Sequence, residues 1–273
     1  MELLKGKKLV FIGAGNMAEA LIRGILKIDL IEKNNLLVCD VNLKQLEFFK
    51  EELGINGTSD NKEGIRWADI IILSIKPQIM PEVLVEISEI IKPEQKIISI
   101  AAGITTKFIE SKFNIEISVI RVMPNTPVLV GQGMAGICKG RYADTQDLEL
   151  VKAIFEAVGK VVVVKEVLME AVTALSGCGP AYLFTIVEVL TDAGVSVGLP
   201  RDTSLTLTIE TIEGAIKMLK QTSEHPAVLR DKVTSPGGAT ISALNVLEEK
   251  GIRSAFIQAV TAANNRAKEL RLE

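Results

Sequence analysis

The chain has 273 residues, of which 48% are hydrophobic and only 4% aromatic, and its formal net charge is −3. This length suffices for one large domain or two ordinary ones with an aliphatic core, and mixed charges without a basic run or aromatic platform exclude nucleic-acid binding. The apolar runs are too short to span a membrane, no signal-peptide segment is visible, and three scattered cysteines suit reduced thiols, so we expect a cytoplasmic protein.

The first part of the chain alternates short apolar runs with amphipathic segments. Runs that are apolar throughout are typical of parallel strands covered on both faces. Strands and helices in this alternation predict an α/β fold with a doubly wound parallel sheet over residues 1–164. The expected strands are residues 9–12, 36–39, 70–75, 97–100, 119–122 and 160–164, and the first helix covers about 17–26.

Residues 165–273 have a different character, helical almost throughout and interrupted by short turns that contain Gly or Pro. Apolar positions such as Leu183, Ile186, Leu190 and Ile209 recur at helical spacing and cover more than one side of their helices. We therefore predict an all-helical second domain that completes its core with a second copy of the chain. A self-contained helical bundle is the alternative.

A glycine-rich turn follows the first predicted strand. Gly13 permits the tight turn, Gly15 lets the backbone approach a pyrophosphate, and Ala18 allows close packing of helix on strand. The start of the helix adds N–H groups and the positive end of its dipole. Because a strand precedes this turn and a helix follows it, a dinucleotide site is favoured over a merely tight turn. The predicted contacts are Ile12, Gly13, Ala14, Gly15, Asn16, Met17 and Ala18.

Asp40 ends the second predicted strand, at the separation from the glycine turn where an acid meets the adenosine ribose. A carboxylate there accepts a hydrogen bond from the 2′-hydroxyl of NAD and repels the 2′-phosphate of NADP. The nearest following cation is Lys44, so the local chemistry favours NADH. The alternative role for Asp40 is that of a helix N-cap.

Two further strand ends carry residues suited to the cofactor, because ligands of open α/β sheets bind at the carboxyl edge. Lys76 is predicted to face a phosphate or a carboxylate, and a solvated loop lysine is the alternative. Small residues after the next strand would let a nicotinamide ring lie close to the backbone, although small residues also serve packing. The residues assigned to the cofactor here are Ser74, Ile75, Lys76, Pro77, Ala101, Ala102 and Gly103.

The segment 234–240, Thr-Ser-Pro-Gly-Gly-Ala-Thr, turns sharply at the start of a predicted helix. Its N–H groups and hydroxyls suit a small anion beside a hydrogen-bonding centre. The sequence contains no metal-ligand cluster or nucleophile elbow, and its one histidine, His225, precedes a proline where it suits a helix cap or the surface. Hydride transfer to an already protonated imine fits a site without a strong protein acid, because the substrate brings its own proton.

Six motifs in order resemble those of the pyrroline-5-carboxylate reductase family over the whole chain. They are residues 13–18, 76–78, 101–103, 121–127, 174–182 and 233–240. The resemblance implies an N-terminal Rossmann domain, a C-terminal helical domain interleaved with that of a neighbouring subunit, and dimers often assembled into decamers. It also implies NAD(P)H-dependent reduction of 1-pyrroline-5-carboxylate to L-proline, the last step of proline synthesis.

The same resemblance implies roles for single residues. Thr240 is similar to a hydroxyl that hydrogen-bonds the ring nitrogen, with Ser235 beside it; by position alone, Thr240 also suits an N-cap. Residues that resemble a substrate pocket or a cofactor contact are Gly237, Gly238 and Ala239 for the substrate carboxylate, Glu166 for the pocket, and Asn61 for adenosine.

Two observations bear on the alternatives. Many relatives carry a group suited to a 2′-phosphate where this chain has Cys39-Asp40-Val41, which again favours NADH. Another two-domain reductase of an imine or a 2-hydroxyacid would need a catalytic Lys or His in the helical part, where none is convincing. A cofactor-sensing protein without turnover is the alternative from a different class, and the intact segment 235–240 argues against it.

Overall fold

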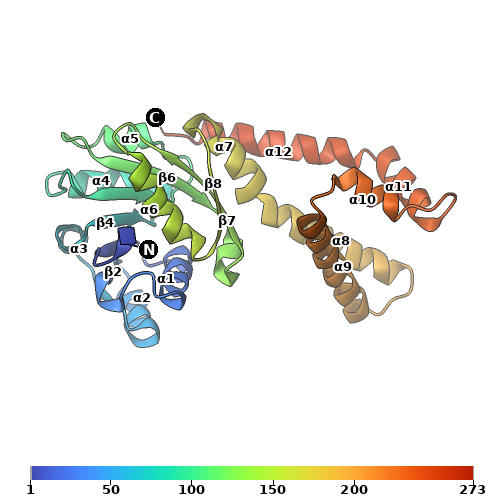
Figure 1. The fold of residues 1–273 in the computed structure, drawn as a ribbon, viewed down its shortest axis with the longest axis horizontal. Coiled ribbons are helices and arrows are strands. Elements are labelled where there is room, and N and C mark those ends of the chain that lie inside the picture. The colour runs from blue at the N-terminus through green and yellow to red at the C-terminus, as the bar shows by residue number, and fades with distance from the viewer. Residues whose placement is uncertain (1, 273) are drawn as a thin grey trace. The chain divides into compact units, whose positions relative to one another are not determined.

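The computed structural model describes residues 2–272, which divide into two compact units (Figure 1). The sheet unit comprises Met1–Cys178 and Ala263–Glu273, and the helical unit comprises Gly179–Ala262. Helix α12, Ile252–Glu269, therefore contributes residues to both units. The compact units divide at 178/179 rather than at the predicted 164/165, and a functional boundary at 164/165 stays a prediction.

An eight-stranded sheet with the order β3-β2-β1-β4-β5-β6-β7-β8 forms the centre of the sheet unit. Neighbouring strands are parallel except β6 and β7, which are antiparallel. The strands are β1 Leu9–Ile12, β2 Leu36–Cys39, β3 Asn56–Thr58, β4 Ile70–Leu73, β5 Lys96–Ser99, β6 Ser118–Pro124, β7 Gly133–Lys139 and β8 Gly159–Val163.

The predicted α/β fold is confirmed, but the expectation of a wholly parallel sheet is wrong at β6 and β7. Only residues 125–132 connect these strands, which is too short for the crossover that a parallel pair needs. The sequence-based prediction also missed β3, a short polar strand, and β7, whose apolar run is interrupted by Gly133 and Gly136.

Helices cover both faces of this sheet (Figure 1). Successive residues of β1 belong to opposite core clusters, with Leu9 in one and Val10 in the other, so the strand is buried on both sides. One face is covered by α1 Asn16–Lys27 and α6 Thr145–Glu156, and the other by α3 Asn61–Trp67, α4 Met80–Ile87 and α5 Thr106–Glu110. The unit also contains α2 Leu43–Phe48 and α7 Met169–Val172.

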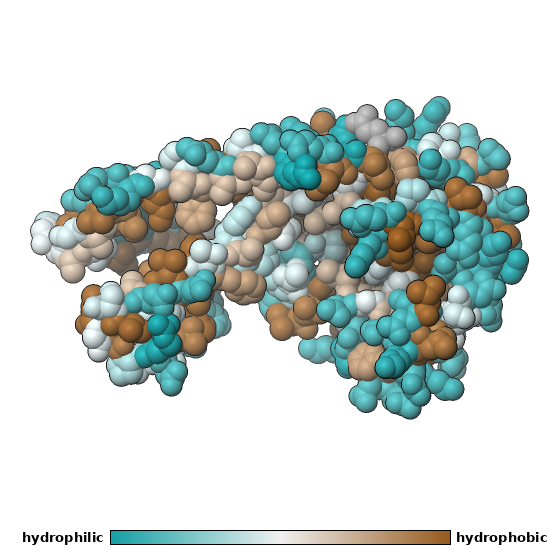
Figure 2. All heavy atoms as spheres, turned by 180° about the vertical axis from the view of Figure 1, so that it is seen from behind, coloured by the Kyte–Doolittle hydropathy of each residue, from teal (hydrophilic) through white to brown (hydrophobic). Residues whose placement is uncertain are grey.

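The helical unit has no buried apolar core of its own within the described residues. Its only buried side chains are the polar Thr191, Ser204 and Thr208, while apolar residues such as Phe184 are exposed. Figure 2 shows hydrophobic surface over these helices. A unit of this kind gains stability by burying its apolar faces against another surface. Its helices are α8 Gly179–Ser196, α9 Arg201–Thr222, α10 Pro226–Lys232 and α11 Ala239–Glu249, followed by α12.

One helical run, Glu166–Ser196, corrects the expectation that no segment is long enough to span a membrane. It has 31 residues, and its most apolar window of 18 residues has a mean hydropathy of 1.3. By length and composition alone it passes as a candidate span. Such a test is weak evidence for a single helix, because a helix that pairs with another protein surface has the same composition.

Asp147 ties α6 to the sheet, and we expect its replacement to lower stability. It is buried, it accepts a hydrogen bond of 2.5 Å from the Ser118 hydroxyl, and it forms an ion pair with Lys96. Burial acts to raise the pKa of the Asp147 carboxyl, but the hydrogen bonds from Lys96 and Ser118 outweigh it and hold the pKa below its ordinary value. Asp147→Asn should therefore cost about 2 kcal/mol of unfolding free energy at pH 7.

The pH dependence follows from this direction of the shift. A carboxyl with a lowered pKa in the folded state stabilises the protein above its unfolded pKa of about 4, and this contribution is lost as the pH falls below that value. Urea denaturation at pH 7 and at decreasing pH should show the gap between the parent protein and Asp147→Asn closing. Glu149→Gln, on the exposed side of the same helix, is the control. A gap that is independent of pH would contradict the ion pair.

Candidate functional site

The glycine turn lies at the carboxyl ends of β1 and β4, where the strand order reverses and open α/β sheets bind ligands. Gly13 has a φ of +99°, and a Cβ placed on it would lie 2.5 Å from the carbonyl oxygen of Ser74. The Gly13 N–H donates to the carbonyl of Cys39 at 2.7 Å. Any other side chain would have to push β1 and β4 apart, so this position requires glycine.

Gly15 was predicted to let the backbone approach a pyrophosphate, and its surroundings allow this. Apart from the two adjoining residues, a Cβ on Gly15 would find no atom within 4 Å, so the backbone is open on that side. Gly15 is also the N-cap of the twelve-residue helix α1 and supplies no capping side chain. Ala18 is fully buried under the helix, as predicted. The N–H groups at the start of α1 and the open space beside Gly15 therefore fit a dinucleotide phosphate.

Asp40 lies directly against this turn. Its Oδ2 accepts a hydrogen bond of 2.8 Å from the Ala14 N–H, and its Oδ1 accepts one of 2.9 Å from the Asn42 N–H. The alternative role of Asp40 as a helix N-cap is wrong, because Asn42 caps α2 and accepts from the Lys44 N–H. Among the described residues no Lys or Arg forms an ion pair with Asp40. The carboxylate is thus held at the end of β2 with its charge uncompensated by the chain.

Asn61, which is predicted to contact adenosine, and Cys39, which precedes Asp40, have different surroundings. Asn61 begins α3 and donates from Nδ2 to Glu86 Oε2 at 2.9 Å, so its amide is oriented by α4. Burial, followed by the nearby carboxylates of Glu63 and Asp60, raises the pKa of the Cys39 thiol to about 12. Cys39 therefore stays a neutral thiol at the end of β2 and does not act as a nucleophile.

The loops that follow β4 and β5 border a cavity of about 450 Å³. Lys76 is exposed at the end of the β4 loop, while Ala101 and Gly103 are buried. Two of the three small residues predicted after β5, Ala102 and Gly103, thus line a cavity, and their contact with a nicotinamide ring stays a prediction. The cavity is lined by Pro77, Gln78, Ala102, Gly103, Arg121, Glu170, Thr173, Cys178, Ala263, Arg266, Ala267, Leu270 and Leu272.

A buried ion pair forms part of the wall of this cavity and was missed from the sequence. Arg121 in β6 and Glu170 in α7 are each 1% exposed, and Arg121 Nη2 lies 3.1 Å from Glu170 Oε1. Arg121 Nη1 and Glu170 Oε2 are buried without a hydrogen-bond partner. A charged residue inside an otherwise apolar strand was the signal available for Arg121, but no local pattern indicates its partner 49 residues away.

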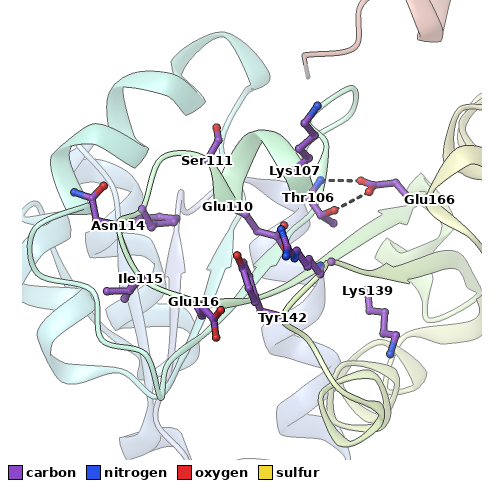
Figure 3. Close-up of a pocket in the computed structure, with 13 residues that line it drawn as sticks. Thr106, Lys107, Glu110, Ser111, Asn114, Ile115, Glu116, Lys139, Tyr142 and Glu166 are labelled. Atoms are coloured by element: carbon purple, nitrogen blue, oxygen red, sulfur yellow. Dashed lines mark hydrogen bonds between the residues drawn. The ribbon is translucent and has the colours of Figure 1, made fainter.

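Glu166 adjoins this pair, with its Oε1 3.8 Å from Arg121 Nη1, and it lines a larger cavity of about 820 Å³ beside α5 (Figure 3). Its Oε1 accepts from the Thr106 N–H at 2.7 Å and its Oε2 from the Thr106 hydroxyl at 2.6 Å (Figure 3). Among the residues that line this cavity, Glu166 is the only predicted site residue. The larger cavity is therefore not the one that gathers the predicted site residues. A substrate role for Glu166 stays a prediction.

The segment 235–240 belongs to the helical unit. Gly237 has a φ of +67°, and Gly238 is the N-cap of α11, a helix of eleven residues. The alternative of Thr240 as N-cap is therefore wrong, since it is the second residue of the helix. Within the described residues the Thr240 hydroxyl has no hydrogen-bond partner. The predicted capping role of His225 is confirmed, because its Nδ1 accepts from the Ala227 N–H at 3.2 Å.

The structure thus gathers the predicted cofactor residues on the carboxyl edge of one sheet, all within the sheet unit. The predicted substrate residues are divided between the units, with Glu166 in the sheet unit and Ser235, Gly237, Gly238, Ala239 and Thr240 in the helical unit.

Two family models match the chain. Residues 166–270 match the model described as pyrroline-5-carboxylate reductase dimerisation. Residues 8–103 match the model described as NADP oxidoreductase, coenzyme F420-dependent. The first match covers the apolar helices that lack a core of their own, which agrees with self-association of the chain through this region.

Proteins of known name match at nearly full length. The chain is 42% identical over 267 residues to a pyrroline-5-carboxylate reductase of Methanosarcina acetivorans, covering 98% of this chain and 99% of the relative. Among solved structures, the pyrroline-5-carboxylate reductase of Coxiella burnetii superposes with a TM-score of 0.92 at 39% identity, over 98% and 99% of the two chains. The Plasmodium falciparum pyrroline carboxylate reductase with NADP bound gives 0.88 at 35% identity over the same shares. This protein belongs to the pyrroline-5-carboxylate reductase family.

Proposed function

We propose that this protein reduces 1-pyrroline-5-carboxylate to L-proline with a hydride from NADH or NADPH. The observation that carries the proposal is the 42% identity to a reductase of that name over 98% of the chain. The chain's own geometry supports it, because Gly13, Gly15 and the start of α1 fit a dinucleotide. The same edge of the sheet borders a cavity of about 450 Å³.

The residues of the chain bind and orient, and none needs to act as a strong acid. A bound reduced nicotinamide supplies the hydride that the C=N carbon accepts. The N–H groups at the start of α11, from Gly238 onward, hold the substrate carboxylate. The Thr240 hydroxyl accepts a hydrogen bond from the protonated ring nitrogen, and Ser235 lies in the same turn. The ring nitrogen keeps its proton in the product, so no group of the protein has to provide one.

The test is to measure oxidation of NADH and of NADPH with 1-pyrroline-5-carboxylate as the acceptor. The proposal expects turnover with this imine and none with a 2-hydroxyacid in the reverse direction with the oxidised cofactor. Turnover of the hydroxyacid alone would assign the chain to another kind of two-domain reductase. Cofactor binding without turnover of either substrate would favour a sensor.

The assembly and the location of the protein belong to the same proposal. Pairing of the helical unit with a second copy would bury the exposed apolar faces of α8 and α9, and dimers would assemble further into decamers. The functional boundary would fall at 164/165. The free cysteines suit the reducing cytoplasm. Light scattering over a concentration series measures the oligomer number.

Asp40 should determine the cofactor preference. Its carboxylate is fixed at the glycine turn by the Ala14 N–H, where it would accept from a ribose 2′-hydroxyl and repel a 2′-phosphate. Asp40→Ser removes the negative charge, and we expect the ratio of kcat/KM for NADH to that for NADPH to fall about tenfold, the effect of about 1.4 kcal/mol. Glu51→Ser, exposed in the helical segment Phe49–Leu53 that follows α2, is the control. An unchanged ratio would refute the ribose contact.

A further inference from the structure

The C-terminal strap, residues 270–272, is hydrogen-bonded to the loop that follows β5. The Leu272 N–H donates to the Gly103 carbonyl at 2.7 Å. In return, the Leu272 carbonyl accepts from the Thr105 N–H at 3.3 Å and from the Thr105 hydroxyl at 2.9 Å. Ile104 and Leu272 form a parallel bridge. A segment 167 residues away in sequence from Thr105 is thus bound to this loop by backbone hydrogen bonds and an isolated β-bridge, outside the eight-stranded sheet.

The loop is shaped to fit the strap at close range. Gly103 has a φ of +76°, and a Cβ on it would lie 2.8 Å from the carbonyl oxygen of Leu270. The two backbones therefore approach as closely as glycine allows. The left-handed conformation of Gly103 also turns the loop away from the direction of β5. The conformation of the β5 loop and the position of the strap accordingly depend on each other.

A second contact joins the strap to α7. Arg271 Nη1 lies 3.9 Å from Glu170 Oε2, and Glu170 pairs in turn with Arg121 of β6. Leu270 and Leu272 face the cavity of about 450 Å³, as do Ala102 and Gly103 of the loop. The strap therefore lines that cavity and also pairs with Glu170, another of its lining residues.

We propose that the strap is a positioning element that fixes the β5 loop for the nicotinamide half of the cofactor. The proposal rests on the proposed function. Asp40 lies on the β2 side of the glycine turn, so the adenosine half belongs there, and a dinucleotide that crosses the strand-order reversal places its other half over β4 and β5. A loop that borders this half must be held rigidly for a reacting ring to be oriented.

The test compares Leu272→Pro with Leu272→Ala in the full-length protein. Proline removes the N–H that donates to Gly103, whereas alanine keeps it and loses only the side chain. Binding of NADH is compared with binding of ADP-ribose, which lacks the nicotinamide, by calorimetry. Relative to alanine, we expect proline to weaken NADH about tenfold and to leave ADP-ribose within about twofold, because one hydrogen bond and the order of the loop are lost.

Arg271→Gln is a second variant, chosen because it breaks the other anchor without changing the backbone. It should give the same selective loss of NADH affinity to a smaller extent, and thermal unfolding of each variant checks that the fold is intact. Equal weakening of NADH and ADP-ribose in both variants would show that the strap only stabilises the domain, and would overturn the proposal. Equal NADH affinity in the proline and alanine variants would overturn it too. A parent protein without turnover on the imine would refute the proposed function alone, since the binding comparison needs no reaction.

Discussion

Thr240→Ala is expected to lower kcat about a hundredfold with 1-pyrroline-5-carboxylate, the scale of losing one oriented hydrogen-bonding group at a reacting centre. Thr240 is the second residue of α11, next to the N–H groups proposed to hold the substrate carboxylate. Its hydroxyl has no hydrogen-bond partner among residues 2–272, so its loss should leave the folded state nearly unchanged. Steady-state kinetics and thermal unfolding of the purified variant measure the two effects.

Thr240→Ser is the matched control because it keeps the hydroxyl and removes only the methyl group. It should retain most of the activity, which separates the hydrogen bond from the shape of the turn. Full activity of Thr240→Ala would refute the assigned role. An equal loss in the serine and alanine variants would show that the methyl group, and not the hydroxyl, is what the reaction requires.

The strands that the sequence predicts well are those whose burial is set by the sheet itself. Leu9–Ile12 and Leu36–Cys39 were predicted to the residue, because both faces of a central parallel strand are covered and every side chain is apolar. β3 escapes this pattern because it is a three-residue strand at the edge of the sheet. β7 lacks this pattern because Gly133 and Gly136 let Val128 and Val172 pack against its backbone. Neither valine belongs to the strand, so the sequence of the strand does not indicate why glycine is needed there.

The candidate site likewise contains residues that the sequence predicts and residues that it does not. The glycine turn and its helix are local in sequence, so Gly13 and Gly15 could be assigned from the spacing alone, and the structure gives each the backbone that this role requires. The C-terminal strap and the Arg121–Glu170 pair join segments far apart in the chain, and no periodicity records such contacts. The apolar faces of α8 and α9 were predicted to complete their core with a second copy of the chain. They are exposed in the single chain, which agrees with that prediction.

The buried pair of Arg121 and Glu170 should carry the largest stability effect of any single polar contact described above. Arg121→Met would remove the ion pairs with Glu170 and, at 3.8 Å, with Glu166, and it would leave the Glu170 carboxylate buried with only Arg271 paired to it, at 3.9 Å. Breaking a buried pair by removing one partner costs about 3–5 kcal/mol, so the variant should unfold at a much lower urea concentration. Arg23→Met, which breaks an exposed pair with Glu19 within α1, should change the unfolding free energy by no more than about 0.5 kcal/mol.

The double variant Arg121→Met with Glu170→Leu decides what the pair contributes. Arg121 Nη1 and Glu170 Oε2 lack hydrogen-bond partners, so part of the cost of burying both charges is not repaid in the folded protein. Apolar side chains of similar volume should therefore recover most of the stability lost in the single variant. The informative case is a double variant that recovers the stability of the parent protein and still binds NADH more weakly than the parent does. That result would show that the pair serves to anchor the strap through Arg271 rather than to hold the fold together. A double variant as unstable as Arg121→Met would instead show that the charges themselves stabilise the fold.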